Sequence, residues 1–371
     1  MEAAIKRASS EELGATGSGL GTNNPSVLER LPRAVRARFM REGIVGLGED
    51  YIAGRWETPD LAGFLAEFVD LPEVRRHKFS VRTLGYVLRA VCTNPQSGRG
   101  VFEVGERHYD LGNTLFSAML DDSMSYTSGI WTGATTLAEA QEEKLRRICE
   151  KLDLKPGMTV LDIGCGWGNF ARYAATHYRV KVIGLTISRE QQALGRERCA
   201  GLPVDIRLQD YREFNERVDR VVSIEMIEAV GHKNLRAFFE AAHRALVPGG
   251  RFVLQVISGN SFTLRSPAFL DQYLLWLVRH IFPNGYLPRL DHLTGREVEP
   301  FLLESMEGFG ESYDRTLQAW RANFDAAWGS LKGRYDERFR RMWHFYLCGC
   351  MACFRRRLVN VYQIVYRRVD S

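Results

Sequence analysis

From residue 158 onward, short apolar runs alternate with longer segments in which polar and apolar residues mix at helical spacing. Short apolar runs of this kind are typical of strands buried in a parallel sheet, and the segments between them are typical of covering helices. The predicted strands are 159–163, 180–185, 204–208, 220–224 and 251–257. The predicted helices are at about 169–178, 188–200 and 234–246. We therefore expect an α/β fold with a doubly wound, Rossmann-like sheet.

The pattern changes on both sides of this alternation. Residues 137–152 form an amphipathic helical pattern, residues 108–124 are predicted to be helical, and an apolar, aromatic insertion at about 262–305 interrupts the alternation. Residues 317–354 are predicted to be helical, and a strand at 359–368 closes the chain.

Polar and glycine-rich segments suggest where the chain divides. We predict a flexible tail at 1–24 and a small, mainly helical N-terminal domain with its own apolar residues at 25–95. A linker at 96–107 leads to a large α/β domain at 108–371. The tail lacks the apolar core of a signal peptide.

Composition narrows the class of protein. A chain of 371 residues with 45% hydrophobic and 26% charged residues is typical of a soluble globular protein of about two domains. The net charge of +5 is modest, and without a basic domain or base-stacking motif a nucleic-acid partner is not expected. The late C-x-C-x-x-C run lacks a second half for zinc, so we predict reduced thiols in a cytosolic protein and no metal site.

The segment VLDIGCGWGNF at 160–170 carries the strongest chemical signal. Asp162 lies near the end of a strand, and three glycines, Gly164, Gly166 and Gly168, precede a helix. Glycine allows a tight turn and the close approach of a ligand. The dinucleotide pattern G-x-G-x-x-G would need a glycine at the position of Asn169. We therefore expect S-adenosylmethionine, which has no pyrophosphate, in the crevice outside the strand.

Two later segments should reach the same crevice. Thr186 ends the second strand, with Gln191 one turn into the next helix, and either could bond a ribose hydroxyl. Asp210 and Tyr211 follow the third strand and could bind an adenine amino group and cover its ring. Alternatively, Asp210 caps a turn and Tyr211 is a core residue.

Several separated motifs together resemble the cyclopropane-fatty-acyl-phospholipid synthases over about residues 28–370. The motifs are GLGEDYIAGRW, HYDLGNTLF, MSYTSGIW, LDIGCGWGNFA, GLTIS, SIEMIEAVGH, IFPNGYLP and GFGESYDRTLQAW. The resemblance implies a class I methyltransferase sheet carrying a lipid-handling or dimerisation domain. It implies transfer of a methyl group from S-adenosylmethionine to the double bond of an unsaturated phospholipid acyl chain. We also expect a cytoplasmic homodimer that contacts the inner face of the membrane, with the N-terminal domain docking on the bilayer, forming the dimer, or both.

The resemblance implies two sets of site residues. The cofactor set is Tyr126, Thr127, Asp162, Gly164, Gly166, Trp167, Gly168, Thr186, Gln191, Asp210 and Tyr211. The catalytic set is Glu228, Tyr313, Ser128, Gln255 and Cys350. Within the second set, Glu228, Ser128, Gln255 and Tyr313 are expected to hold a bicarbonate or carbonate ion that removes a proton from the added methyl group.

Two of these positions depart from the family pattern. Ser128 stands where a cysteine is usual, and Gln255 stands where a histidine is usual. Both keep hydrogen-bond donors for an anion. The cation could also resolve to a methyl or methylene branch, and a non-catalytic lipid-binding protein is a further alternative.

Each catalytic candidate also has a structural interpretation. Glu228 could be an acid at a helix N-terminus, Tyr313 and Cys350 could be core residues, and Gln255 needs partners wherever it points. The apolar helix of the insertion could wall an acyl tunnel, lie at the membrane interface, or cover the sheet. The triplet 355–357 could bind lipid head groups or form a solvated face.

Overall fold

The structure of the protein, a computed structural model, describes residues 26–76, 112–259, 268–283, 285–299 and 301–369. The predicted tail and linker lie outside the described residues.

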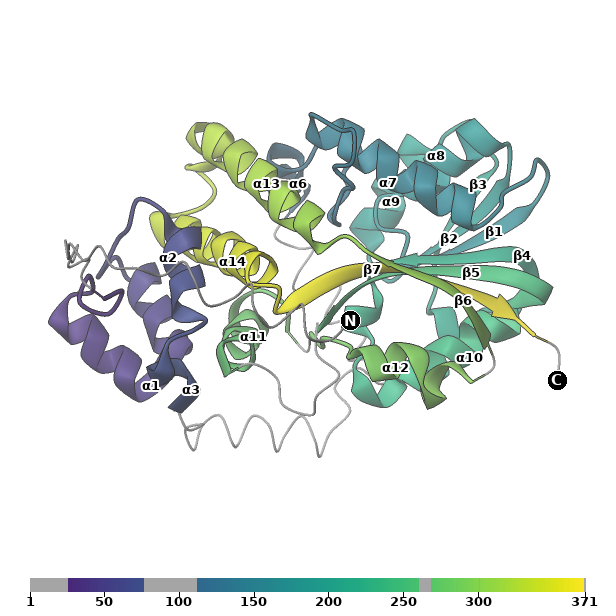
Figure 1. The fold of residues 1–371 in the computed structure, drawn as a ribbon. Helices are drawn as coiled ribbons and strands as arrows, with labels where there is room; N and C mark the ends of the chain where they lie inside the picture. The colour runs from purple at the N-terminus through teal and green to yellow at the C-terminus, as the bar shows by residue number, and fades with distance from the viewer. Residues whose placement is uncertain (1–25, 77–111, 260–267, 284, 300, 370–371) are drawn as a thin grey trace, which may run out of the picture.

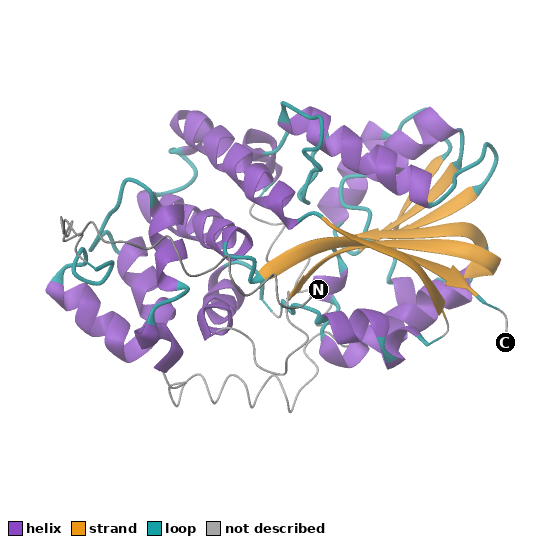
Figure 2. Cartoon of the chain, viewed as in Figure 1, coloured by secondary structure: helices purple, strands orange, loops and turns teal. Residues whose placement is uncertain are grey.

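A seven-stranded sheet forms the centre of the larger part of the molecule (Figures 1 and 2). Its strands are β1 (Thr159–Ile163), β2 (Lys181–Thr186), β3 (Val204–Leu208), β4 (Val218–Ile224), β5 (Leu246–Gly259), β6 (Phe301–Gly308) and β7 (Val359–Arg368). They lie in the order β3-β2-β1-β4-β5-β7-β6. The first five strands pair in parallel, whereas β7 runs antiparallel to both β5 and β6. The predicted α/β fold class is confirmed.

Strand β6 was not predicted. It lies at the edge of the sheet, it begins at the end of the segment assigned to the insertion and continues past it, and most of its residues are exposed. An edge strand with one open side does not need the continuous apolar run that marks a central strand. A prediction based on apolar runs therefore missed β6.

Helices cover both faces of the sheet, as a doubly wound fold requires (Figure 1). On one face lie α7 (Leu137–Lys151), α8 (Asn169–Tyr178) and α9 (Arg189–Arg198). On the other lie α10 (Leu235–Ala245) and α12 (Leu290–Thr294). In the described part of the chain, four 3-10 turns connect the elements: η1 (Tyr211–Glu213), η2 (Ile227–Ala229), η3 (His232–Asn234) and η4 (Arg296–Val298).

The predicted helical stretch 317–354 is two helices, α13 (Gly310–Leu331) and α14 (Glu337–Arg355). The break follows from local chemistry, because the Asp336 side chain accepts the Phe339 N–H at 2.7 Å and caps a new helix. Of the predicted helix 108–124, the described part contains the short α6 (Asn113–Met119).

The N-terminal segment shares one hydrophobic core with the larger part of the molecule. Its helices are α1 (Arg33–Ile52), α2 (Leu61–Phe68) and α3 (Pro72–Arg76), which lie beside α14 and the insertion helix α11 (Ala268–His280) (Figure 1). Apolar residues of α1 and α2 belong to the same buried cluster as those of α11, α13 and α14. Within the described residues, none of the helices is both long and apolar enough to cross a membrane.

Candidate active site

A cavity of about 360 Å³ lies where the carboxyl ends of the parallel strands face helices α11, α13 and α14. Its polar end is formed by the glycine loop and by the residues that follow β2, β3 and β4. Its apolar end is formed mainly by Leu270, Leu274, Leu277, Phe282, Leu317 and Phe354. A polar compartment is thus continuous with an apolar one.

The glycine loop follows β1 with its backbone in left-handed conformations. The φ angles of Gly164, Gly166 and Gly168 are 82°, 53° and 78°. A Cβ at Gly164 would lie 2.4 Å from the Met226 side chain, whereas a Cβ at Gly166 would meet no other atom within 4 Å. Gly164 and Gly166 line the cavity, while Gly168 does not and instead precedes α8. Gly164 therefore leaves room for the Met226 side chain, and Gly166 leaves bare backbone at the cavity wall.

Asp162 brings a buried carboxyl group to the same wall. It is 1% exposed, and its Oδ2 atom has no hydrogen-bond partner among the described residues. Burial raises the pKa of Asp162 to about 7, and the nearby positive charge of Lys144 opposes this rise. Such an unpartnered carboxyl oxygen fits a ligand that carries donors or positive charge.

Lys144 is a site residue that the sequence analysis missed. It is 1% exposed, and its ammonium group donates to Thr127 Oγ1 at 2.7 Å and to Gln141 Oε1 at 2.6 Å. Burial lowers the pKa of Lys144 to about 8. Gln141 and Lys144 lie three residues apart on the buried face of α7. Two polar residues on an otherwise apolar helix face were the available signal.

The residues after β2 form a small polar unit. The Thr186 hydroxyl donates to Gln191 Oε1 at 2.7 Å, and both side chains are buried and line the cavity. This bond leaves the Gln191 amide NH₂ group available as a donor. The pair carries no charge.

Asp210 and Tyr211 line the cavity and also have structural contacts. Asp210 accepts the Arg212 N–H at 2.9 Å and forms an ion pair with the Arg212 guanidinium. The Tyr211 ring packs edge to face against Phe238, with centroids 5.5 Å apart. Asp210 therefore caps a turn and Tyr211 packs against the core, and both residues also line the cavity.

Residues of the loop before α7 and of the glycine loop complete the polar end. The Tyr126 hydroxyl lies 2.7 Å from the Tyr346 hydroxyl of α14, and Trp167 Nε1 donates to Asn113 at 3.1 Å. Tyr126, Thr127 and Trp167 all line the cavity.

Two glutamates, Glu225 and Glu228, follow β4 and line the cavity. Glu228 Oε1 accepts the Ile257 N–H at 2.6 Å, while its Oε2 atom has no partner among the described residues. Burial, followed by the negative charge of Glu225, raises the pKa of Glu228 to about 8. Burial also raises the pKa of Glu225, while hydrogen bonds and Lys144 oppose the rise.

Ser128 and Gln255 contact Glu225 rather than Glu228. Glu225 Oε1 accepts the Ser128 N–H at 3.0 Å and Gln255 Nε2 at 2.7 Å. The Ser128 hydroxyl donates to the carbonyl of Gly129 at 2.9 Å. Neither Ser128 nor Gln255 lines the cavity, because the Glu225 side chain stands in front of them.

Tyr313 and Cys350 reach the cavity from α13 and α14. The Tyr313 hydroxyl hydrogen-bonds with the Glu225 carboxyl group, and its ring packs 4.6 Å from Phe354. Burial raises the pKa of Cys350 to about 12. The Cys350 thiol is therefore uncharged at neutral pH, and this does not suit a nucleophile.

The insertion helix α11 forms a wall of the cavity rather than a cover for the sheet. The ring of Trp276 is buried and lies 4.8 Å from that of Phe345 of α14, on the side facing α1. Residues on the other side, including Leu274, line the cavity. The helix is thus held between α1 and α14.

The arginine triplet 355–357 contacts acidic residues of the same chain. The ion pairs are Arg355–Asp314, Arg356–Asp70 and Arg357–Glu311. These pairs tie the end of α14 to α13 and to the N-terminal segment.

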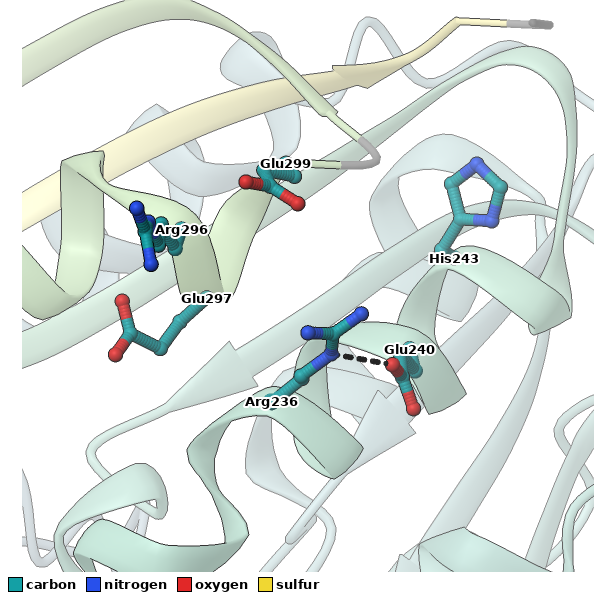
Figure 3. Close-up of a pocket in the computed structure, with 6 residues that line it drawn as sticks. All are labelled: Arg236, Glu240, His243, Arg296, Glu297 and Glu299. Carbon is teal, nitrogen blue, oxygen red and sulfur yellow. Dashed lines mark hydrogen bonds and ion pairs between the residues drawn. The ribbon is translucent and has the colours of Figure 1, made fainter.

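A second hollow, of about 380 Å³, lies between α10 and η4 (Figure 3). It is lined by Arg236, Glu240, His243, Arg296, Glu297 and Glu299. Arg236 pairs with Glu240 at 2.8 Å on an exposed helix face. This hollow includes none of the predicted site residues and lacks an apolar wall.

Comparison with known proteins identifies similar sequences and structures. The family model described as mycolic acid cyclopropane synthetase matches residues 96–364. The chain is 44% identical over 335 residues to the cyclopropane-fatty-acyl-phospholipid synthase of Escherichia coli strain K12, covering 89% of this chain and 85% of that protein. It is 32% identical over 357 residues to the tuberculostearic acid methyltransferase of Mycobacterium tuberculosis, covering 91% and 82%.

Among solved structures, a cyclopropane synthase from Mycobacterium tuberculosis aligns with a TM-score of 0.67 at 32% identity, covering 72% of this chain and 98% of that one. A mycolic acid cyclopropane synthase complexed with SAH and CTAB aligns with the same values.

Proposed function

The chain belongs to the cyclopropane synthase family of S-adenosylmethionine-dependent methyltransferases, and from this membership we propose that it forms cyclopropane rings on the unsaturated acyl chains of phospholipids. The observation that carries the proposal is the continuity of the cavity. A polar end with a glycine loop adjoins an apolar end lined by leucine and phenylalanine side chains, which suits a hydrocarbon chain. The two glutamates after β4 belong to this one cavity.

The polar end fits the cofactor. The buried, unpartnered Asp162 Oδ2 suits a cationic ligand, and the bare backbone at Gly166 allows close approach. Thr186 and Gln191 would bind ribose hydroxyls, and Tyr211 would cover the adenine. When bound, S-adenosylmethionine supplies an electrophilic methyl group. The cavity-lining members of the predicted cofactor set are thus proposed to hold it.

The apolar end serves the chemistry by excluding water. Attack by a double bond on a methyl group leaves a carbocation on the acyl chain, and water would trap that cation. Leucine and phenylalanine side chains of α11, α13 and α14 keep that end apolar. The cation must then lose a proton. One candidate base is a bicarbonate ion near Glu228, and the other is a carboxylate of the chain itself.

The product distinguishes this function from its nearest alternative, a branching methyltransferase. The purified protein would be incubated with methyl-deuterated S-adenosylmethionine and vesicles of mono-unsaturated phospholipid. We expect a saturated product with a three-membered ring and the loss of one deuterium from the methyl group. An exocyclic methylene group in the unlabelled product, seen by NMR, or a methyl group that keeps all its deuterium, would contradict ring formation and support branching. No cofactor binding by calorimetry would support the non-catalytic alternative.

We also propose that the protein is a cytoplasmic homodimer that associates peripherally with the inner face of the membrane. The support is that its proposed substrate is a membrane phospholipid. The N-terminal domain would take part in handling the lipid or in forming the dimer. The triplet 355–357 is a weak candidate for lipid contact, because all three arginines pair with acids of the chain.

A further inference from the structure

Glu225 occupies an unusual backbone conformation for its residue type. It is the first residue after β4, and its φ angle is +50°. A side chain in this left-handed region is disfavoured relative to glycine, and such conformations persist where the surroundings impose them. In this conformation the Glu225 carboxyl group faces Ser128, Gln255 and Tyr313.

The donors predicted to hold a bicarbonate ion are already bonded to the Glu225 carboxyl group. The Ser128 N–H, the Gln255 amide and the Tyr313 hydroxyl come from three different elements and converge on it. A carboxylate and a bicarbonate ion share a planar, singly charged O–C–O group that accepts hydrogen bonds. The Glu225 carboxylate can therefore accept the hydrogen bonds that a bicarbonate ion would accept from these donors.

We propose that the Glu225 carboxylate is the general base of the reaction and takes the place of a bound bicarbonate ion. The inference rests on the proposed function and names its base. A Glu225 oxygen accepts one proton from the added methyl group, and the electron pair of that C–H bond closes the ring on the cationic carbon. The acyl chain becomes neutral and the carboxylate becomes a carboxylic acid, which later passes its proton to water.

The two glutamates differ in charge because they differ in partners. Glu225 accepts three hydrogen bonds and interacts favourably with the buried ammonium of Lys144. Glu228 accepts only a backbone N–H and is repelled by Glu225, so its pKa rises to about 8. Of the two carboxyl groups, Glu225 is therefore the one that ionises first as the pH rises. Two neighbouring carboxyl groups with separated pKa values are a common arrangement for acid–base catalysis.

A hydrogen-bond chain orients the amide that faces Glu225. Lys151 Nζ donates to Gln363 Oε1 at 2.5 Å, Gln363 Nε2 donates to Gln255 Oε1 at 3.0 Å, and Gln255 Nε2 donates to Glu225 at 2.7 Å. An ammonium group can only donate, so it fixes the direction of both amides. Lys151 thus acts as a positioning residue that keeps a donor pointed at the base. A histidine at position 255 could lose this donor on titration, whereas glutamine cannot.

The first test uses the wild-type protein in buffer freed of carbon dioxide. We expect unchanged turnover, and no stimulation by added bicarbonate. Glu225→Gln should lower kcat by about a hundredfold or more, since a general base contributes roughly 10²–10⁴. Its affinity for SAH should stay within about twofold of the wild type, because the amide keeps the shape of the acid. A wild type that needs bicarbonate, or a fully active Glu225→Gln, would overturn the assignment.

Glu225→Gly provides a second, independent variant. Glycine accepts a φ angle of +50°, so this variant keeps the backbone conformation at position 225, and circular dichroism and SAH binding would check that it is folded. It should be inactive without carbon dioxide and regain turnover with added bicarbonate, formate or acetate. Absence of rescue in a folded, cofactor-binding variant would argue against a base at this position. If the wild type makes no lipid product, the proposed function fails; if it makes product and Glu225→Gln makes as much, only the base assignment fails.

The positioning role of Lys151 is tested by Lys151→Met, with Lys155→Met as the control. Lys155 is an exposed lysine that pairs with Asp153. Without the fixed donor, the Glu225 carboxylate is less stabilised, so the acid limb of the kcat profile should move to higher pH while KM is kept. Glu228, Lys144 and Tyr313 also face Glu225 and are unchanged in this variant. An unmoved acid limb would remove Lys151 from the proposal.

Discussion

At the scale of single residues, the site depends on titratable groups that are buried. Asp162 and Lys144 are each 1% exposed, and Glu225 and Glu228 lie at the cavity wall. Burial disfavours the charged form of each group, so the pKa values of the carboxyl groups rise and that of the lysine falls. Groups tuned in this way toward neutral pH are common at functional sites.

Asp162 should make cofactor binding depend on pH. Its pKa in the free protein is about 7. If the ionised form binds the cationic cofactor, affinity rises as pH rises through this pKa, by about tenfold between about pH 6 and about pH 8. Calorimetry at several pH values would measure the change. Asp162→Asn should bind weakly and without this dependence. A wild-type affinity that stays constant across this range would contradict the role of Asp162.

At the scale of secondary structure elements, polar residues on buried helix faces mark the site. Helix α7 begins with a capping box, in which Thr136 and Glu139 satisfy each other's backbone N–H groups. The same helix carries Lys144, which lines the cavity, and Lys151, which bonds to Gln363 of β7. One helix therefore supports both the cofactor end and the hydrogen-bond chain to Glu225.

Helix α11 should determine which acyl chains enter the cavity. Leu274 lines the cavity, whereas its half-buried neighbour Leu275 does not. Leu274→Trp should fill part of the apolar end and lower kcat/KM for the lipid by about tenfold, because small displacements of a bound substrate are costly. Binding of SAH should be unchanged. Leu275→Trp is the matched control and should be much less affected. Equal losses in both variants would indicate a general disturbance of the helix.

At the scale of the whole molecule, the N-terminal segment and the larger part of the chain are joined by a shared core. Arg341 of α14 illustrates the junction. Its guanidinium donates to the carbonyls of Tyr51 and Trp56 at 2.5 and 2.7 Å, pairs with Glu57 at 2.6 Å, and stacks over the Tyr51 ring. These contacts close the end of α1 against α14. Because α14 also lines the cavity, the contacts of the N-terminal segment with α14 help to hold one wall of the site in place.

Replacement of Arg341 should therefore destabilise the molecule as one unit. Arg341→Met leaves two carbonyls without their donors and should lower the free energy of unfolding by about 2–4 kcal/mol. Denaturant unfolding followed by both tryptophan fluorescence and circular dichroism should show one transition at lower denaturant concentration. Arg338→Met, at an exposed position of the same helix, should have little effect. Two separate transitions would show that the N-terminal segment unfolds independently.

The sequence by itself determined six of the seven strands of the sheet and the glycine loop after β1. Apolar runs, helical spacing and glycines that need positive φ angles are local properties, so strands β1, β3 and β7 and helix α8 were found with their bounds. Only the tertiary structure decided which glutamate receives the donors, because Ser128 and Gln255 lie 97 and 30 residues from Glu225. The same holds for the buried environment of Lys144 and for the core shared with the N-terminal segment. Contacts between residues far apart in the chain leave no periodic pattern, and these contacts set the charge and orientation of the groups in the site.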